Sequence, residues 1–145
     1  MRTNLLTFIL FVLSTLLIAC EPDSTRDSVR KSDLVGSRWE LTELTFEDSR
    51  VELADFDPIL LEFRQDLIGG ETICNTYRVS WQLGRDGQVR TAGPLSQTRR
   101  GCLENAADVS EAYIAVLEQI HTIVLDGDTL IIDSRSGKLI FKDAK

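Results

Sequence analysis

Hydrophobic and polar residues alternate most regularly between residues 72 and 83. Apolar and aromatic residues, among them Tyr77 and Trp81, occupy most of the odd positions, whereas the even positions are polar or cysteine. A period of two is typical of a half-buried β-strand. The Gly-Arg-Asp-Gly sequence at 84–87 then predicts a turn into a second strand at 88–91.

Shorter apolar stretches predict further strands on both sides of this hairpin. Alternation around Trp39 and over residues 59–63 predicts strands in the first half. Three apolar runs near the C-terminus are separated by turn sequences, of which the first is Asp-Gly, and they predict a strand hairpin followed by one more strand. These runs are residues 123–125, 130–132 and 139–141.

One helix is predicted between these two groups of strands. Val109, Tyr113 and Leu117 recur at helical spacing together with Val116 and Ile120, and several alanines raise the helix propensity. Asn105, followed by Asp108, resembles a helix N-cap. The pattern predicts a mainly β fold of the α+β class: one antiparallel sheet, curled into a partly open barrel, with one helix before the C-terminal hairpin strands.

The first twenty residues have the pattern of a bacterial lipoprotein signal. Arg2 precedes an apolar run at 5–17, which ends in Leu-Ile-Ala-Cys at Cys20. This ending resembles a lipobox, and it predicts cleavage before Cys20 and a covalent lipid on that cysteine, with no other cofactor. An uncleaved anchor helix and an ordinary secretory signal are the alternatives. Residues 1–19 are thus the predicted signal peptide.

Residues 20–33 predict a flexible tether, because charged residues, Ser and Pro leave too little apolar surface to offset the entropy of ordering. Residues 34–145 are long enough for one domain. Loss of Arg2 with the signal changes the formal net charge of the chain from −7 to −8. An acidic protein of this kind is not expected to bind nucleic acid, and its attachment to a membrane has to come from the lipid.

A series of short motifs resembles the META domain family, whose bacterial members include HslJ-like lipoproteins. The resemblance covers essentially residues 34–145. Ile73 stands where the family commonly has Gly, and Arg100-Gly101 stands where it has Met-Ala. The matching motifs, in order, are Gly36-x-x-Trp39-x-Leu41, Leu61-x-Phe63, Cys74-Asn75-x-Tyr77, Gly93-Pro94-Leu95, Thr98-Arg99-x-x-Cys102, Gly127-Asp128-x-Leu130 and Leu139-x-Phe141.

The resemblance implies an envelope lipoprotein that supports stress tolerance or envelope integrity, without an established reaction. Glu21 follows the predicted lipidated cysteine in place of the Asp that enterobacterial sorting treats as an inner-membrane retention signal. In a Gram-negative cell this resemblance favours the outer membrane, with the domain facing the periplasm. The sequence does not specify the partner, the oligomeric state or the organism.

Two cysteines remain once Cys20 is acylated, namely Cys74 and Cys102. An even number of thiols in an oxidising compartment favours a disulfide between them. Closing this loop is worth roughly 3–4 kcal/mol in the loop-entropy model. Two free thiols and a metal site are the alternatives, but there is no CxxC motif, and His121 is the only histidine, so no metal ligand set is predicted.

No residues form a recognisable catalytic pattern. His121 stands alone, and the serines lack a nucleophile-elbow context. Asp126 and Asp128 flank a turn glycine. Asp55 and Asp57 lack EF-hand spacing, although they leave a weak calcium site open, and Arg99-Arg100 leaves an anion site open. The sequence predicts a protein that is not an enzyme.

Two functions remain open: binding of an envelope protein or peptide, and lipocalin-like carriage or sensing of a small apolar ligand. Both would use a groove where the aromatic strand meets the helix. The pattern leaves open whether these faces form a filled core or a cleft. The candidate groove residues are Phe63, Tyr77, Trp81, Tyr113 and Leu117.

Overall fold

The computed structural model describes residues 28–53 and 55–145. The predicted signal peptide, the lipidation site at Cys20 and most of the predicted tether lie outside the described residues. Within the described part, no helix is long and apolar enough to cross a membrane.

A single antiparallel sheet of nine strands forms the body of the molecule. Its order is β6-β5-β4-β3-β1-β9-β8-β7, and β2 adds to β1. The strands are β1 (Arg38–Phe46), β2 (Ser49–Val51), β3 (Leu60–Phe63), β4 (Leu67–Glu71), β5 (Thr76–Leu83), β6 (Val89–Gln97), β7 (Ile120–Asp126), β8 (Thr129–Ser134) and β9 (Gly137–Asp143). The helical elements are α2 (Lys31–Leu34), the 3₁₀ turn η1 (Arg85–Gly87) and α3 (Glu104–Glu118).

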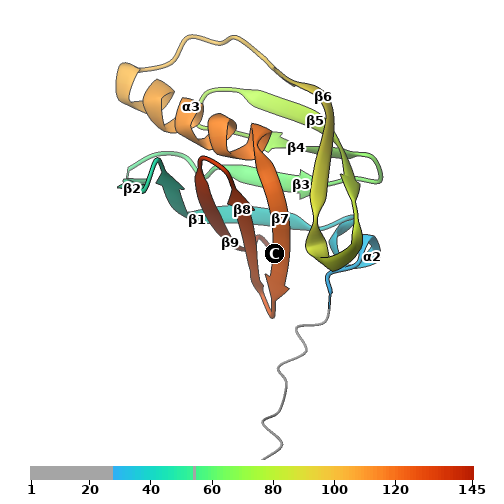
Figure 1. Ribbon diagram of the computed structural model, residues 1–145. Helices are drawn as coiled ribbons and strands as arrows, with labels where there is room; N and C mark the ends of the chain where they lie inside the picture. Colours follow the sequence, from blue (N-terminus) through green and yellow to red (C-terminus); the bar gives the residue numbers. More distant parts are fainter. Residues whose placement is uncertain (1–27, 54) are drawn as a thin grey trace, which may run out of the picture.

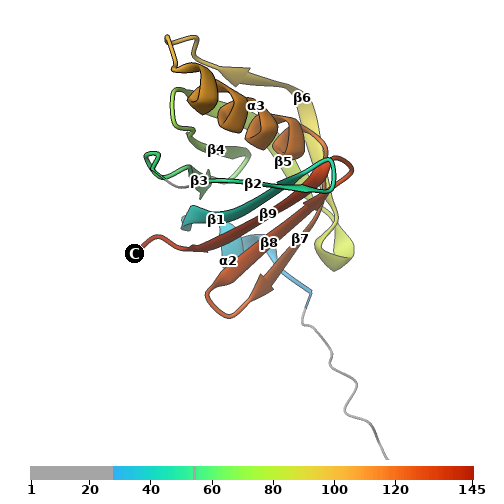
Figure 2. The same cartoon turned by 90° about the vertical axis from the view of Figure 1, so that its left-hand side faces the viewer.

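The sheet curls until its two edge strands, β6 and β7, approach each other. Gln88, just before β6, forms an isolated bridge with Thr122 of β7. Helix α3 connects β6 to β7 and lies along the open side of the curled sheet (Figures 1 and 2). This is the partly open antiparallel barrel with one helix before the C-terminal strands that the sequence predicts.

The inner face of the sheet and the buried face of α3 form one hydrophobic core. Its aromatic rings meet edge to face, a favourable geometry. The ring centroids of Phe63 and Trp81 lie 5.1 Å apart, those of Tyr77 and Tyr113 lie 5.5 Å apart, and those of Tyr113 and Phe141 lie 6.4 Å apart. Rings in such contact fill the space between the sheet and the helix.

The residues that the sequence offers as a possible groove form a packed core instead. Phe63, Tyr77, Trp81, Tyr113 and Leu117 are all buried, none with more than 4% of its surface exposed. The sequence correctly places the aromatic strand against the helix. The two faces interdigitate, however, because the curvature of the sheet brings β5 and α3 into direct contact.

Three elements have other bounds than the sequence predicts. The strand predicted at 72–83 begins at Thr76, because residues 72–75 form a turn in which the N–H of Thr72 donates to the carbonyl of Asn75. The next strand, β6, extends to Gln97, well beyond the predicted 88–91. Helix α3 has Leu103 at its N-cap, and Asn105 lies inside its first turn.

Two buried tyrosine hydroxyls join the helix to the sheet. The hydroxyl of Tyr77 donates to the carbonyl of Leu60 over 3.0 Å, so the hydroxyl of Tyr113 donates to Tyr77. Gly70 makes this approach possible, because a Cβ there would lie 1.9 Å from the Leu60 carbonyl oxygen and 3.0 Å from the Tyr77 hydroxyl. Burial is the main cause that raises the pKa of both tyrosines above the ordinary value, so they stay neutral.

The two hydroxyls should differ in their contribution to stability. Tyr77→Phe removes the donor to Leu60 and leaves the Tyr113 hydroxyl unpaired in the core, so we expect a loss of about 1–3 kcal/mol. Tyr113→Phe leaves the bond from Tyr77 to Leu60 in place, and we expect a smaller loss of about 0.5–1 kcal/mol. Urea unfolding of both variants measures the difference, and equal losses would contradict this order.

The same pair predicts a response to alkali. The folded-state pKa of each tyrosine lies above its unfolded value of 10.0. The two neutral hydroxyls therefore contribute fully to the free energy of unfolding below pH 10. This contribution is lost as the pH rises from 10 towards the pKa values of the folded state. The Tyr77→Phe/Tyr113→Phe double variant should lose stability less steeply above pH 10 than the wild type.

Candidate functional site

A depression opens on the surface where the turn before β5 meets the connection from β6 to α3. Its volume is about 610 Å³. A smaller hollow of about 140 Å³ shares Phe56, Asp57 and Ile73 with it. We call the two together the disulfide groove. The larger part is lined by Asp55, Phe56, Asp57, Ile73, Cys74, Arg100, Gly101, Cys102, Leu103, Asn105 and Ala106.

A disulfide between Cys74 and Cys102 forms part of the groove wall. Their Cα atoms lie 5.7 Å apart, and the bond closes a loop with a sequence separation of 28 residues. This is the pairing that the number of cysteines favours. The bond ties the turn at 72–75 to the connection at 98–103, two segments that no β-ladder joins directly.

Asn75 holds the same two segments together by hydrogen bonds. Its side-chain oxygen accepts from the Thr98 hydroxyl over 3.0 Å and from the backbone N–H of Arg100 over 2.9 Å. The Thr98 hydroxyl in turn accepts from the backbone N–H of Thr76. Asn75 thus caps the backbone N–H of Arg100.

Thr72 stabilises the turn that carries Cys74. Its hydroxyl accepts from the N–H of Asn75 over 3.0 Å and lies 3.1 Å from the Asn75 carbonyl, to which it donates. A hydroxyl that bonds its own turn favours this local structure over a continued strand. The covalent link and the polar contacts make the wall of the groove rigid.

Leu103 is the exposed large hydrophobic residue of the described part of the chain, with 78% of its surface exposed. It precedes α3 and lines the groove together with the half-buried Phe56 and Ile73. Leu103, Phe56 and Ile73 give the groove an apolar part among its charged and polar lining residues. Leu103 and Phe56 each stand outside the periodic apolar runs of the sequence, so periodicity does not mark them.

Charged residues of both signs surround this apolar surface. Asp55 and Asp57 stand on the side of the loop before β3, and Arg100 stands in the connection to α3. Among the ion pairs found within residues 28–53 and 55–145, none includes these three side chains. Their charges are thus available to a partner.

The residues considered for chemistry lie apart from one another. His121 is exposed on β7, and Asp126 and Asp128 flank the turn between β7 and β8. Ser110 is buried in α3, and its hydroxyl has no hydrogen-bond partner among the residues that the structure describes. In the described segments, no three His, Cys, Asp or Glu side chains come together as a metal site. Asp55 and Asp57 share only the edge of the groove.

Comparison with known proteins identifies the fold and the family. The META domain family matches residues 32–145, which is most of the chain. The chain belongs to the META domain family. The resemblance read from the motifs at Gly36, Cys74 and Cys102 is thereby confirmed. No curated protein matches the chain.

Two solved structures share the architecture of this META domain. An NMR structure of a protein from Burkholderia xenovorans superposes with a TM-score of 0.67 at 21% identity, covering 79% of this chain and 86% of the other. A second NMR structure superposes with a TM-score of 0.60 at 20% identity, covering 79% and 94%. At these identities the similarity concerns the fold.

Proposed function

We propose that this META domain protein is a non-enzymatic lipoprotein of the cell envelope that binds a segment of another protein in the disulfide groove. The observation that carries the proposal is Leu103, which projects into solvent beside a groove whose wall is fixed by a disulfide and by Asn75. A rigid apolar site loses little entropy when a partner binds.

The charges at the groove indicate the chemistry of the partner. Asp55 and Asp57 lie on one side, within a chain of net charge −7. They favour a segment that carries Lys or Arg next to an apolar side chain, and Arg100 can hold a backbone carbonyl or a carboxylate of that segment. Predicted lipidation at Cys20 and export to the periplasmic side of the outer membrane make an envelope protein the expected source. A role in stress tolerance or envelope integrity follows from the family resemblance.

The carrier alternative has less support. A pocket for a small apolar ligand inside the barrel would lie between Phe63, Trp81, Tyr77 and Tyr113, whose rings are in contact. Catalysis by His121 would need partners around an imidazole that stands exposed on β7. Turnover of a peptide, glycan or ester substrate that is lost in His121→Ala would overturn the non-enzymatic proposal.

Photo-crosslinking in living cells tests the groove. A benzoylphenylalanine at position 103 of the full-length protein should give a discrete protein adduct, whereas the same group at the exposed Arg85 should not. Asp55→Asn/Asp57→Asn should lower the yield of the adduct about five-fold, which corresponds to roughly 1 kcal/mol of charge attraction. The matched control is Asp126→Asn/Asp128→Asn, which removes the same charge elsewhere. Equal yields from the two double variants would contradict the proposed site.

A further inference from the structure

The N-terminal end of the described chain is fixed to one end of the barrel. Val29 packs against the core beside Gly87, where an added Cβ would lie 3.4 Å from Val29 Cγ1 and 2.3 Å from the Ile123 carbonyl oxygen. Lys31 pairs with Asp66 over 3.2 Å, and its ammonium lies 5.5 Å from the centre of the Trp81 ring. The chain therefore enters the domain at η1 and the turn between β3 and β4.

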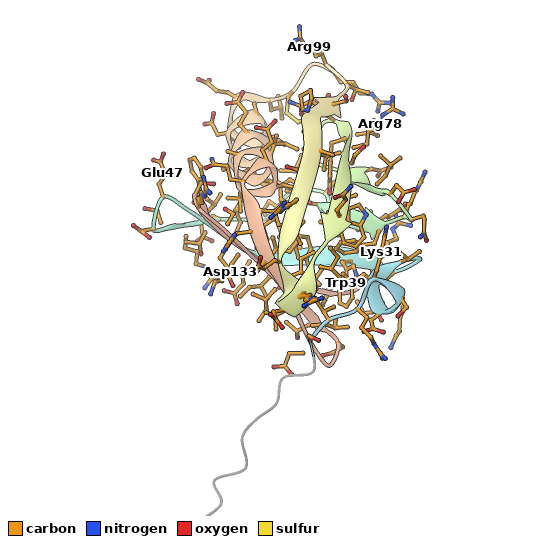
Figure 3. All side chains as sticks on the ribbon, turned by 45° about the vertical axis from the view of Figure 1, so that its right-hand side comes forward. Lys31, Trp39, Glu47, Arg78, Arg99 and Asp133 are labelled. Carbon is orange, nitrogen blue, oxygen red and sulfur yellow. A yellow bond between two sulfur atoms is a disulfide. The ribbon has the colours of Figure 1, made fainter. Side chains whose placement is uncertain are left out.

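The disulfide groove lies at the opposite end. Strand β5 runs from Thr76, next to the groove, to Leu83, next to η1. Its eight residues span about 25 Å at the usual rise per residue. Figure 3 shows the same arrangement: Arg99 lies at the top of the domain, whereas Lys31 and Trp39 lie in its lower part.

We infer that the lipoprotein holds the disulfide groove away from the membrane, about 25–55 Å above the bilayer surface. This inference rests on the proposed lipid anchor at Cys20. Eight residues lie between Cys20 and Val29. The nine Cα–Cα steps from Cys20 to Val29 reach at most about 30 Å when fully extended. The lower limit corresponds to η1 resting on the bilayer, and the upper limit to a fully extended tether.

Turning the groove towards the bilayer would be costly. It would lift η1 about 25 Å from the lipid, which is close to the full reach of about 30 Å that the chain between Cys20 and Val29 allows. The acidic domain is also repelled by anionic headgroups. The partner that fills the groove is therefore a protein segment that projects into the aqueous space at this height, and neither lipid nor a membrane-embedded segment fits.

Fluorescence quenching in proteoliposomes tests this orientation on the full-length acylated protein. One fluorescent amino acid is placed at position 103 or, in a second variant, at the exposed position 85 in η1. The vesicles contain phosphatidylcholine with a spin-label quencher on its headgroup. Because the two positions differ in height by about 25 Å, we expect quenching at position 85 to be at least about two-fold stronger. Duplicating residues 21–28 should weaken the quenching at position 85.

The outcomes separate the inference from the proposal on which it rests. Equal quenching at both positions of the acylated protein, or stronger quenching at position 103, would overturn the outward orientation and leave the lipid anchor intact. A mature chain without acyl groups, recovered from its own host, would overturn the anchor and this inference together. Acrylamide, a soluble quencher, should reach both labels equally, which shows that the difference reports distance from lipid.

Discussion

Cys20→Ala should abolish the incorporation of labelled palmitate and leave the signal peptide uncleaved. The reason is chemical, because the lipid needs the thiol of the predicted lipobox cysteine, and cleavage before that residue follows lipidation in the lipoprotein pathway that the sequence resembles. Each buried methylene contributes about 0.8 kcal/mol to membrane attachment, so in the mature wild-type protein the acyl chains supply the attachment. Palmitate labelling and the mass of the N-terminal peptide measure both effects.

The control for this experiment is Glu21→Asp, which changes the neighbouring residue and keeps the thiol. Its palmitate incorporation should equal that of the wild type, while the sorting rule that the sequence resembles predicts retention in the inner membrane. Equal labelling and membrane partition of Cys20→Ala and the wild type would refute the lipoprotein interpretation.

Local signals were sufficient to predict most of the strands and the helix. The apolar runs at 123–125, 130–132 and 139–141 became β7, β8 and β9, because Asp-Gly and similar turns fix the pairing of strands that are adjacent in sequence. The helical spacing of Val109, Tyr113 and Leu117 likewise became the buried face of α3. Such signals depend on contacts within a few residues.

Features that depend on distant contacts were harder to predict. The turn at 72–75 interrupts an otherwise regular alternation, because Thr72 bonds its own backbone and the disulfide holds the turn against the connection at 98–103. Periodicity places Tyr77 and Tyr113 on apolar faces, but it does not give the distance between those faces. Direct contact between them, supported by Gly70, decides that they form a core.

The candidate site could be predicted in part. The number of cysteines favoured the bond between Cys74 and Cys102, which the structure contains. Leu103 and Phe56 could not be recognised, since a single apolar residue in a loop is more often buried than exposed. Only the path of the chain from β6 to α3 shows that Leu103 remains in solvent.

Removal of the disulfide should have the largest effect on stability. We expect Cys74→Ser/Cys102→Ser to lower the free energy of unfolding by about 3–4 kcal/mol, because the bond closes a loop with a separation of 28 residues in the unfolded chain. For a domain of this size the loss corresponds to a decrease of roughly 10–20 °C in Tm. Calorimetry on the oxidised, periplasmically produced protein measures it, and reduction of the wild type should produce the same decrease.

The same double substitution should also weaken binding of the partner in the groove. This second effect separates the role of the bond in binding from its role in stability. Without the bond, the hydrogen bonds of Asn75, of the Thr98 hydroxyl and of the Thr98 backbone N–H still hold the start of the connection at 98–103 beside the turn. Leu103 would then occupy more conformations, and a partner would have to order it on binding. Crosslinking from position 103 should decrease at a temperature where the double variant remains folded, whereas Tyr77→Phe, which destabilises the core but keeps the bond, should leave it unchanged. Two reactive thiols in the native, unreduced wild type would contradict the bond itself, and unchanged crosslinking in the double variant would show that the groove does not need it.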